Sequence, residues 1–165
     1  EMIEAAKHES VPCNDVAREA VSYIKVYYPN LYIYFLSEVA DDFCIETNRF
    51  FLMLSLRELL YNAAKYSDQQ NISLRITHSR LSKGHAGGSV QFIVEDTGKG
   101  IAPEDRESIF KFFTKIDDLS QGLGLGLPLS KRHAQNLGGD LTLDTDYQQG
   151  CRFILEIPCQ PLNLG

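Results

Sequence analysis

Three short stretches of the chain combine polar side chains and glycines at spacings that suit binding chemistry. The first, RELLYNAAKYS, holds Glu58, Asn62 and Lys65 at intervals of four and three residues, which places them on one stripe of a helix. A carboxylate, an amide and an ammonium group on an otherwise apolar helix are costly to bury without partners. The stripe indicates either a polar ligand or a solvent-exposed face, and this stretch alone leaves both open.

The second stretch, VEDTGKGIAP, places Asp96 at the end of an apolar run, followed by Gly98 and Gly100. A fixed carboxylate accepts hydrogen bonds, for example from an exocyclic amine, and glycines let the backbone approach a flat ligand. The alternative is a tight turn in which the Asp bonds to its own backbone. Taken alone, the stretch favours the turn.

The third stretch, GLGLGLPLSKR, alternates glycine and leucine: Gly122, Leu123, Gly124, Leu125, Gly126 and Leu127. Bare backbone N–H groups just before a helix N-terminus favour an anion, and phosphate is the natural one. The leucines would anchor the loop to the core, which a plain hinge does not require. No GK[ST] follows at the Walker A spacing, and the stretch does not open a βαβ unit, so it is neither a P-loop nor a dinucleotide fingerprint.

Alternating helices and strands are expected to position these stretches. The patterns predict helices over 14–28, 48–66, 103–113 and 128–137, and strands over 31–39, 43–46, 72–77, 89–95, 140–145 and 151–157. Asn14 is the expected N-cap of the first helix. The first two strands are expected to pair as a hairpin.

Composition limits the class of protein. The 165 residues suit one compact domain, and a net charge of -6 with dispersed basic residues argues against nucleic-acid binding. Four separated cysteines, Cys13, Cys44, Cys151 and Cys159, without a CxxC pair favour reduced, buried thiols in cytoplasm. No apolar run approaches the roughly 20 residues that span a bilayer. The chain begins without Met, so we expect a piece of a longer protein whose membrane segments, if any, lie elsewhere.

In this order and at this separation, the three stretches resemble the N, G1 and G2 boxes of the ATP-binding catalytic domain of sensor histidine kinases. These kinases belong to the GHKL superfamily, with type II topoisomerases, mismatch-repair ATPases and heat-shock chaperones. FKFFTKIDD, between the last two stretches, resembles the F box and lid. The resemblance covers about 11–158 and implies the Bergerat fold, an α/β (α+β) two-layer sandwich with a mixed, mostly antiparallel sheet and helices on one face.

For the helix stretch, the resemblance implies a role in holding metal and phosphates. Asn62 would bind Mg²⁺ through its side-chain oxygen, Lys65 would contact the ATP phosphates and Tyr66 would border the nucleotide. Many histidine kinases have Asn where this chain has Glu58, and in the ATPase branches such a Glu activates water. The catalytic role of Glu58 therefore stays open.

For the other stretches, the resemblance implies a pocket around ATP in which Asp96 reads the adenine amino group. A Thr or Ser commonly follows the glycine of the last strand and supports that carboxylate, whereas here Gly150 precedes Cys151, a weaker donor. The remaining implied residues are Gly98, Gly100 and Ile101 for the floor and wall, Phe110 and Phe113 for the lid, Lys115 for the phosphates, and Gly122, Gly124 and Gly126 with Leu123, Leu125 and Leu127 around the triphosphate.

The resemblance implies transfer of the γ-phosphoryl group of Mg-ATP to a histidine on a separate dimerisation hairpin, and from there to a response-regulator receiver domain. HESVP at His8 only echoes the acceptor context HExxRTP, and seven residues before it are too few to build a hairpin. We therefore expect 1–10 to be a linker or hairpin remnant, 11–160 the catalytic domain and 161–165 a tail. The parent would be a homodimer, and this domain would contact neither nucleic acid nor membrane.

Two other functions stay open. One is a GHKL-type ATPase that uses Glu58 to activate water, which the kinase-like third stretch disfavours. The other is a non-catalytic nucleotide-binding docking module, against which the intact Asn62, Lys65 and Asp96 weigh.

Overall fold

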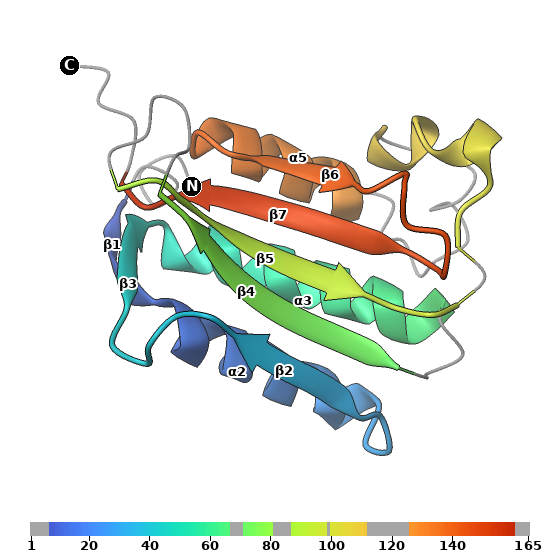
Figure 1. Cartoon of the computed structure of the whole chain (residues 1–165), viewed down its shortest axis with the longest axis horizontal. Helices are drawn as coiled ribbons and strands as arrows, with labels where there is room; N and C mark the ends of the chain where they lie inside the picture. The colour runs from blue at the N-terminus through green and yellow to red at the C-terminus, as the bar shows by residue number, and fades with distance from the viewer. Residues whose placement is uncertain (1–6, 67–70, 81–86, 99, 112–125, 161–165) are drawn as a thin grey trace.

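A sheet and a layer of helices make up the described part of the chain, as Figure 1 shows. The computed structural model describes residues 7–66, 71–80, 87–98, 100–111 and 126–160. In chain order the elements are β1 (Glu9–Pro12), α2 (Cys13–Tyr27), β2 (Ile33–Ser37), β3 (Cys44–Thr47), α3 (Arg49–Tyr66), β4 (Ile72–Ser79), β5 (Ser89–Glu95), the 3₁₀ turns η1 (Pro103–Asp105) and η2 (Ser108–Phe110), α5 (Gly126–Asn136), β6 (Asp140–Leu143) and β7 (Arg152–Pro158).

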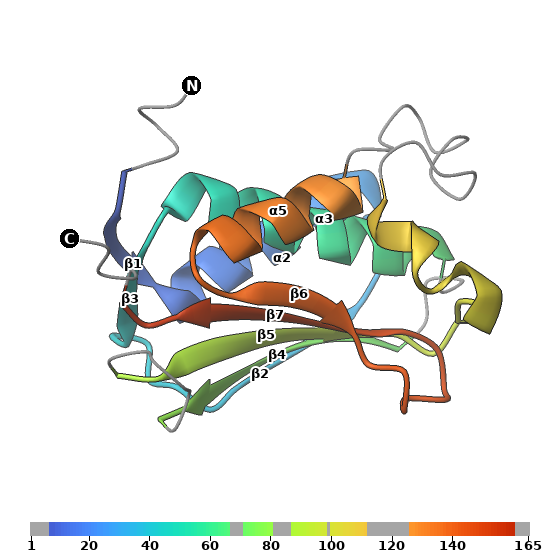
Figure 2. The ribbon, with the colours of Figure 1, turned by 90° about the horizontal axis from the view of Figure 1, so that it is seen from above.

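The main sheet has five strands in the order β2-β4-β5-β7-β6. β2 runs parallel to β4, and the other neighbouring pairs are antiparallel. Figure 2 shows α2, α3 and α5 together on one face of this sheet, and no described helix covers the other face. The predicted two-layer fold with a mixed, mostly antiparallel sheet is confirmed.

Side chains alternate between the two faces of the sheet, as strand geometry requires. On β5, Phe92 and Val94 are buried in the core, while Ile93 and Glu95 are half-buried on the opposite face. The next residue, Asp96, is also buried and by the same alternation lies on the core side. The end of β5 therefore presents its carboxylate toward the helical layer.

Helix α3 forms the centre of the helical layer and packs against both α2 and α5. Leu52, Leu56, Leu59 and Leu60 are almost fully buried, as expected of a helix that is apolar on most of its surface. The polar stripe is thus carried by an element that packing holds in place. Within the described ranges, no helix is long and apolar enough to cross a membrane.

The expected hairpin over 31–39 and 43–46 is wrong. β2 pairs with β4 and β3 pairs with β1. The Glu38 N–H continues the β2–β4 ladder by donating to the Ile76 carbonyl at 2.9 Å, and β2 forms the edge of the five-stranded sheet. Alternation predicted both strands, but it carries no information about partners.

Strand β1 begins at Glu9, inside the segment 1–10 expected as a linker or hairpin remnant. Glu9 lies opposite Thr47, and Ser10 lies opposite Glu46. Residues 1–6 are outside the described part. The assignment of that segment to a hairpin remnant stays a prediction.

Asn14 is not an N-cap, because α2 already starts at Cys13 and the cap position, Pro12, makes no side-chain cap bond. The Asn14 amide is buried and donates to the Val39 carbonyl at 3.0 Å and to Asp41 at 2.9 Å. Asn14 therefore ties α2 to the connection between β2 and β3.

The single helix expected over 103–113 is replaced by η1 and η2 within the described residues. Of these two turns, only Ile109 is buried, which is too little apolar surface to hold a short helix. The cysteine prediction is also partly wrong: Cys13, Cys151 and Cys159 are buried free thiols, but Cys44 is exposed because it lies at the outward side of β3.

Candidate functional site

The Asp96 carboxylate, at the end of β5, is 6% exposed. Its Oδ1 accepts hydrogen bonds from the backbone N–H groups of Gly98 at 2.8 Å and Cys151 at 3.3 Å, while the Asp96 N–H donates to the Cys151 carbonyl at 2.9 Å. Among the described residues nothing donates to Oδ2. The tight-turn interpretation is confirmed, since Asp96 closes a turn through Oδ1. The role of its carboxylate toward a ligand stays a prediction.

Gly150 packs against Asp96 at close range, and Gly100 packs against Gly150. Gly150 has a φ of +154°, and a Cβ there would collide with the Asp96 backbone carbonyl. Gly100 has a φ of +75°, and its Cβ would lie 3.1 Å from the Gly150 carbonyl. A side chain at Gly150 would not fit against Asp96, and one at Gly100 would crowd the Gly150 backbone. The two glycines therefore let the backbone segments around Asp96 pack closely, and the predicted role of Gly100 as the floor of a pocket stays a prediction.

Burial raises the pKa of the Asp96 carboxyl, and the N–H groups of Gly98 and Cys151 partly oppose that shift. Burial first, and then the neighbouring Asp96 charge, raise the pKa of the Cys151 thiol to about 12. The thiol is therefore neutral near pH 7 and is a weak donor. Cys151 supports Asp96 through its backbone N–H.

On α3, the Asn62 Nδ2 donates to Glu58 Oε2 at 3.2 Å. The Glu58 carboxylate lies directly against Gly126, where a Cβ would collide with it. Gly126 is the first residue of α5, so this carboxylate sits at a helix N-terminus, which the helix dipole favours. The structure thus brings Glu58, Asn62 and Gly126 together. Lys65 lies in the last turn of α3 and is half-buried.

The two groups share one end of the molecule. In Figure 2, the C-terminal part of α3, the C-terminal end of β5 and the start of α5 all lie at the same side. Glu58 and Asn62 of the first stretch, Asp96 of the second and Gly126 of the third therefore lie toward the same end of the molecule; their part in binding stays a prediction.

Other predicted residues border this region. Ile101 is half-buried against the core, and Leu127 is buried. The Phe110 ring is half-buried, packs edge-to-face on Phe153 with ring centroids 6.2 Å apart, and lies 4.7 Å from the Lys131 Nζ. Outside the described residues are Phe113, Lys115, Gly122, Leu123, Gly124 and Leu125. Tyr66 ends α3, but its side chain is likewise outside the description.

One contact at the site had no sequence signal. The Tyr147 hydroxyl donates to the Asp96 carbonyl at 3.1 Å. Tyr147 lies between β6 and β7, in a segment that reads only as a turn, and no periodic pattern marks it. Its proximity follows from the pairing of β7 with β5, which could not be read from the turn itself.

The model of the family described as histidine kinase-, DNA gyrase B-, and HSP90-like ATPase matches residues 47–161. The match includes all of the predicted site residues. Among curated proteins, the chain is 29% identical over 157 residues to the sensor-like histidine kinase SenX3 of Mycolicibacterium smegmatis, covering 93% of this chain and 39% of that protein.

A second relative is the aerobic respiration control sensor protein ArcB of Escherichia coli, with 32% identity over 107 residues, covering 62% of this chain and 13% of that protein. The chain therefore spans well under half the length of these relatives. Solved structures show the same fold. The catalytic domain of the histidine kinase ThkA, free of nucleotide, gives a TM-score of 0.72 at 24% identity, covering 94% of this chain and 99% of that one. Full-length ShkA in complex with AMPPNP gives a TM-score of 0.74 at 25% identity, covering 92% of this chain and 31% of that one.

Proposed function

Because the chain belongs to the histidine kinase-, DNA gyrase B-, and HSP90-like ATPase family, we propose that it binds Mg-ATP and serves as the catalytic domain of a sensor histidine kinase. The γ-phosphoryl group would pass to a histidine on a dimerisation hairpin of the same protein, and then to a response-regulator receiver domain. The parent would be a homodimer that holds this domain in the cytoplasm. The names of its relatives, which are sensor kinases, support this branch of the family.

The observation that carries the proposal is the Asp96 carboxylate. It is buried, its Oδ1 is held by two backbone N–H groups, and its Oδ2 has no donor within the described part of the chain. Burying a charged oxygen without a partner is costly, and an exocyclic amine would supply the missing donor. The adjacent glycines suit a flat purine. We assign Asp96 to the adenine amino group, with Gly98, Gly100 and Ile101 as the floor and wall of the pocket.

The α3 side chains suit a metal-bound triphosphate. The Asn62 Nδ2 is engaged by Glu58, which leaves Oδ1 as a side-chain oxygen of the kind that Mg²⁺ prefers. We assign Asn62 as the Mg²⁺ ligand. A bound Mg²⁺ ion supplies neutralisation of phosphate charge. The residues that we assign to the phosphates and the borders of the nucleotide are Lys65, Tyr66, Lys115, Gly122, Gly124 and Gly126, with Phe110, Phe113, Leu123, Leu125 and Leu127 anchoring the segment around them.

Phosphoryl transfer depends mainly on positioning and on stabilising charge at the reacting phosphate. In this chain, Asp96 would fix the base, and the start of α5 would direct N–H groups and the positive end of its dipole at the phosphates. These groups position the donor but do not include the acceptor. The domain alone is therefore expected to bind ATP well and to transfer poorly.

Supplying an acceptor tests the proposal. The chain is incubated with Mg-ATP labelled at the γ-phosphate and with the purified hairpin of its own parent protein. We expect the hairpin to acquire a label that is lost in acid and kept in alkali, as a phosphohistidine is. Nucleotide binding without any transfer to this hairpin would instead support a non-catalytic docking module.

One observation favours a second function, an ATPase. The Glu58 carboxylate lies against the first residue of α5, beside Asn62, where a water next to the phosphates would be within its reach. Steady ATP hydrolysis by the chain alone, removed by Glu58→Gln, would support this reading. The kinase proposal expects negligible hydrolysis in both variants and reduced transfer to the hairpin in Glu58→Gln.

A further inference from the structure

A chain of polar contacts lies directly behind Asp96, on the face of the sheet that no described helix covers. The Glu95 Oε2 accepts hydrogen bonds from Arg75 Nη2 and Arg152 Nε, both at 2.6 Å. The Arg152 Nη1 also donates to Asp144 Oδ2 at 3.0 Å. Charge-assisted bonds of this kind are strong when partly buried, and the Glu95 side chain is only 18% exposed. The network joins β4, β5 and β7 at the residue before Asp96.

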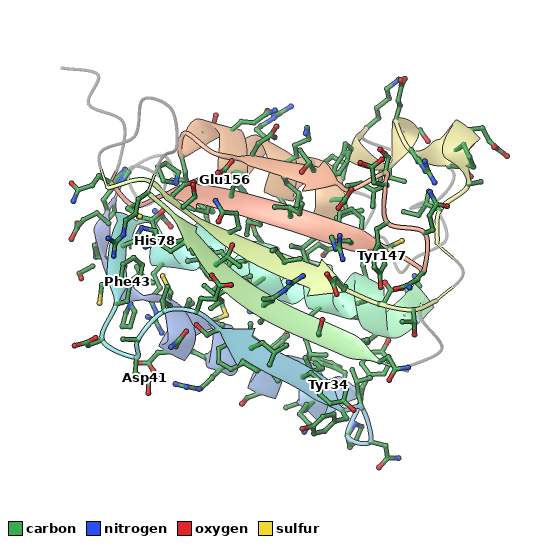
Figure 3. The ribbon with its side chains drawn as sticks, in the orientation of Figure 1. Tyr34, Asp41, Phe43, His78, Tyr147 and Glu156 are labelled. Atoms are coloured by element: carbon green, nitrogen blue, oxygen red, sulfur yellow. The ribbon has the colours of Figure 1, made fainter. Side chains whose placement is uncertain are left out.

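Tyr147 connects this network to the site. The Arg152 guanidinium lies over the Tyr147 ring, 4.3 Å from its centroid, and the Tyr147 hydroxyl donates to the Asp96 carbonyl. Figure 3 shows Tyr147 beside the end of the sheet where β7 begins. The ring is thus held by a guanidinium that two carboxylates fix in turn.

The Asp96 carbonyl belongs to the Asp96–Thr97 peptide, one peptide before the Gly98 N–H. The orientation of that peptide sets the course of the chain to Gly98, whose N–H holds Asp96 Oδ1. The other backbone contact, from the Asp96 N–H to Cys151, fixes only the preceding peptide. The Tyr147 hydroxyl therefore adds a hydrogen bond to the Asp96–Thr97 peptide from the segment between β6 and β7.

We propose that Tyr147, held by Arg152, is a positioning residue that aims the Asp96 carboxylate at the exocyclic amine of a purine nucleotide. The inference rests on the proposed function, because it takes Asp96 as the group that reads the base. It adds that selectivity for the amine is controlled from the opposite face of the sheet.

The test is Tyr147→Phe, which removes one hydroxyl and keeps the ring under Arg152. Calorimetry with Mg²⁺ compares ATP with purine riboside 5′-triphosphate, which lacks the exocyclic amine. We expect the affinity for ATP to fall about five-fold, as for loss of one hydrogen bond, and the affinity for the analogue to stay unchanged. The ratio of the two affinities then contracts about five-fold.

A matched control is Tyr34→Phe, the same deletion on an exposed tyrosine of β2, also labelled in Figure 3. It should change neither affinity. Equal losses for both ligands in Tyr147→Phe would mean a merely structural role, and unchanged affinities would mean none; either result overturns the inference.

Arg152→Lys adds a second readout, because it keeps the charge but loses the planar fork that bonds Glu95 and covers Tyr147. We expect it to reproduce part of the loss in ATP selectivity and to add nothing in the Tyr147→Phe background. Fully additive losses would contradict a single path through the ring. If the wild-type chain does not bind ATP, or if Asp96→Asn binds it equally well, the proposed function fails instead. If Asp96→Asn weakens ATP binding but Tyr147→Phe does not, only this inference is overturned and the proposed function stands.

Discussion

At the end of β5, backbone groups hold Asp96, whereas on α3 another side chain, Glu58, holds Asn62. The Asp96 Oδ1 has two N–H donors from neighbouring strands and turns, while the Asn62 amide has a single 3.2 Å contact to a neighbour on its own helix. Backbone contacts within a paired sheet leave little freedom to a side chain. A side-chain pair on a helix surface can rearrange at small cost.

The difference suits the two parts of the nucleotide that we propose for this site, with the base at Asp96 and the phosphates at α3. A base is a rigid ring that is the same before and after phosphoryl transfer, so a preformed site for it costs little to keep. The phosphates change during the reaction, and adjustable groups can follow them. We therefore expect substitutions at the Asp96 side to have larger effects than comparable ones on α3.

Asp96→Asn should have the largest effect on binding. The amide keeps the size of the carboxylate but places N–H donors where Asp96 would accept hydrogen bonds, from the exocyclic amine and from the backbone. Donors that face other donors in a buried site are costly. We expect the affinity for Mg-ATP to fall about 100-fold, or about 2.7 kcal/mol, in calorimetry. The control is Asp41→Asn, an exposed carboxylate at the other end of the molecule (Figure 3), which should bind normally. Normal binding by Asp96→Asn would remove the purine assignment.

Substitutions at two glycines, Gly150 beside Asp96 and Gly126 beside Glu58, compare the stability of the two regions. An Ala at Gly150 would collide with the fixed Asp96 carbonyl, whereas an Ala at Gly126 would collide with the movable Glu58 carboxylate. We expect Gly150→Ala to lower the free energy of unfolding by about 2 kcal/mol. For Gly126→Ala we expect a change within about 1 kcal/mol, because the better helix former offsets the displacement of Glu58. Urea unfolding measures both, and equal losses would argue against the contrast.

Asn62→Ala should have a smaller effect that depends on magnesium. With Mg²⁺ we expect the ATP affinity to fall about ten-fold, or about 1.4 kcal/mol, because one ligand oxygen is lost. With chelator in place of Mg²⁺ we expect no difference from wild type. Asn136→Ala, at the exposed end of α5, is the control. A loss that is equal with and without Mg²⁺ would show that Asn62 does not hold the metal.

The smallest expected effect is on the pH dependence of stability. Burial raises the folded-state pKa of Asp96 above its usual value of 3.8, so the folded chain binds this proton more tightly than the unfolded chain. The resulting extra stability is complete below pH 3.8 and is lost as the pH rises through the folded-state pKa. Relative to Asp96→Asn, the wild-type free energy of unfolding should therefore decline over that interval in urea titrations. A rise over the same interval would contradict the burial of an ionising carboxylate.

Local patterns predicted the two strongest elements closely. β5 spans the predicted 89–95, and α3 begins one residue after the predicted 48 and ends at the predicted 66. Both owe their structure to their own apolar sequence. The contact between Glu58 and Asn62 also follows from helical spacing, since side chains four residues apart share a face.

Contacts between distant segments could not be predicted in the same way. The partner of β2 is β4, and its Ile33 lies opposite Ile72, a choice made by packing of the whole sheet. The same holds for Tyr147, whose ring and hydroxyl meet Arg152 and Asp96 only after β7 has paired with β5. A turn sequence specifies its own bend but not the residue it will face.

The small ribbon of β1 and β3 has a consequence for a longer protein that carries this domain. The Glu46 N–H donates to the Cys159 carbonyl at 2.8 Å, directly after β7, and the Cys159 N–H donates to Gly88 at 3.0 Å. Figure 1 shows this ribbon and the end of β7 together, at the end of the sheet far from Asp96. A pull on the chain at Glu9 and at Cys159 would therefore load the hydrogen bonds of this ribbon first, before those of the strand ends at the opposite side of the sheet.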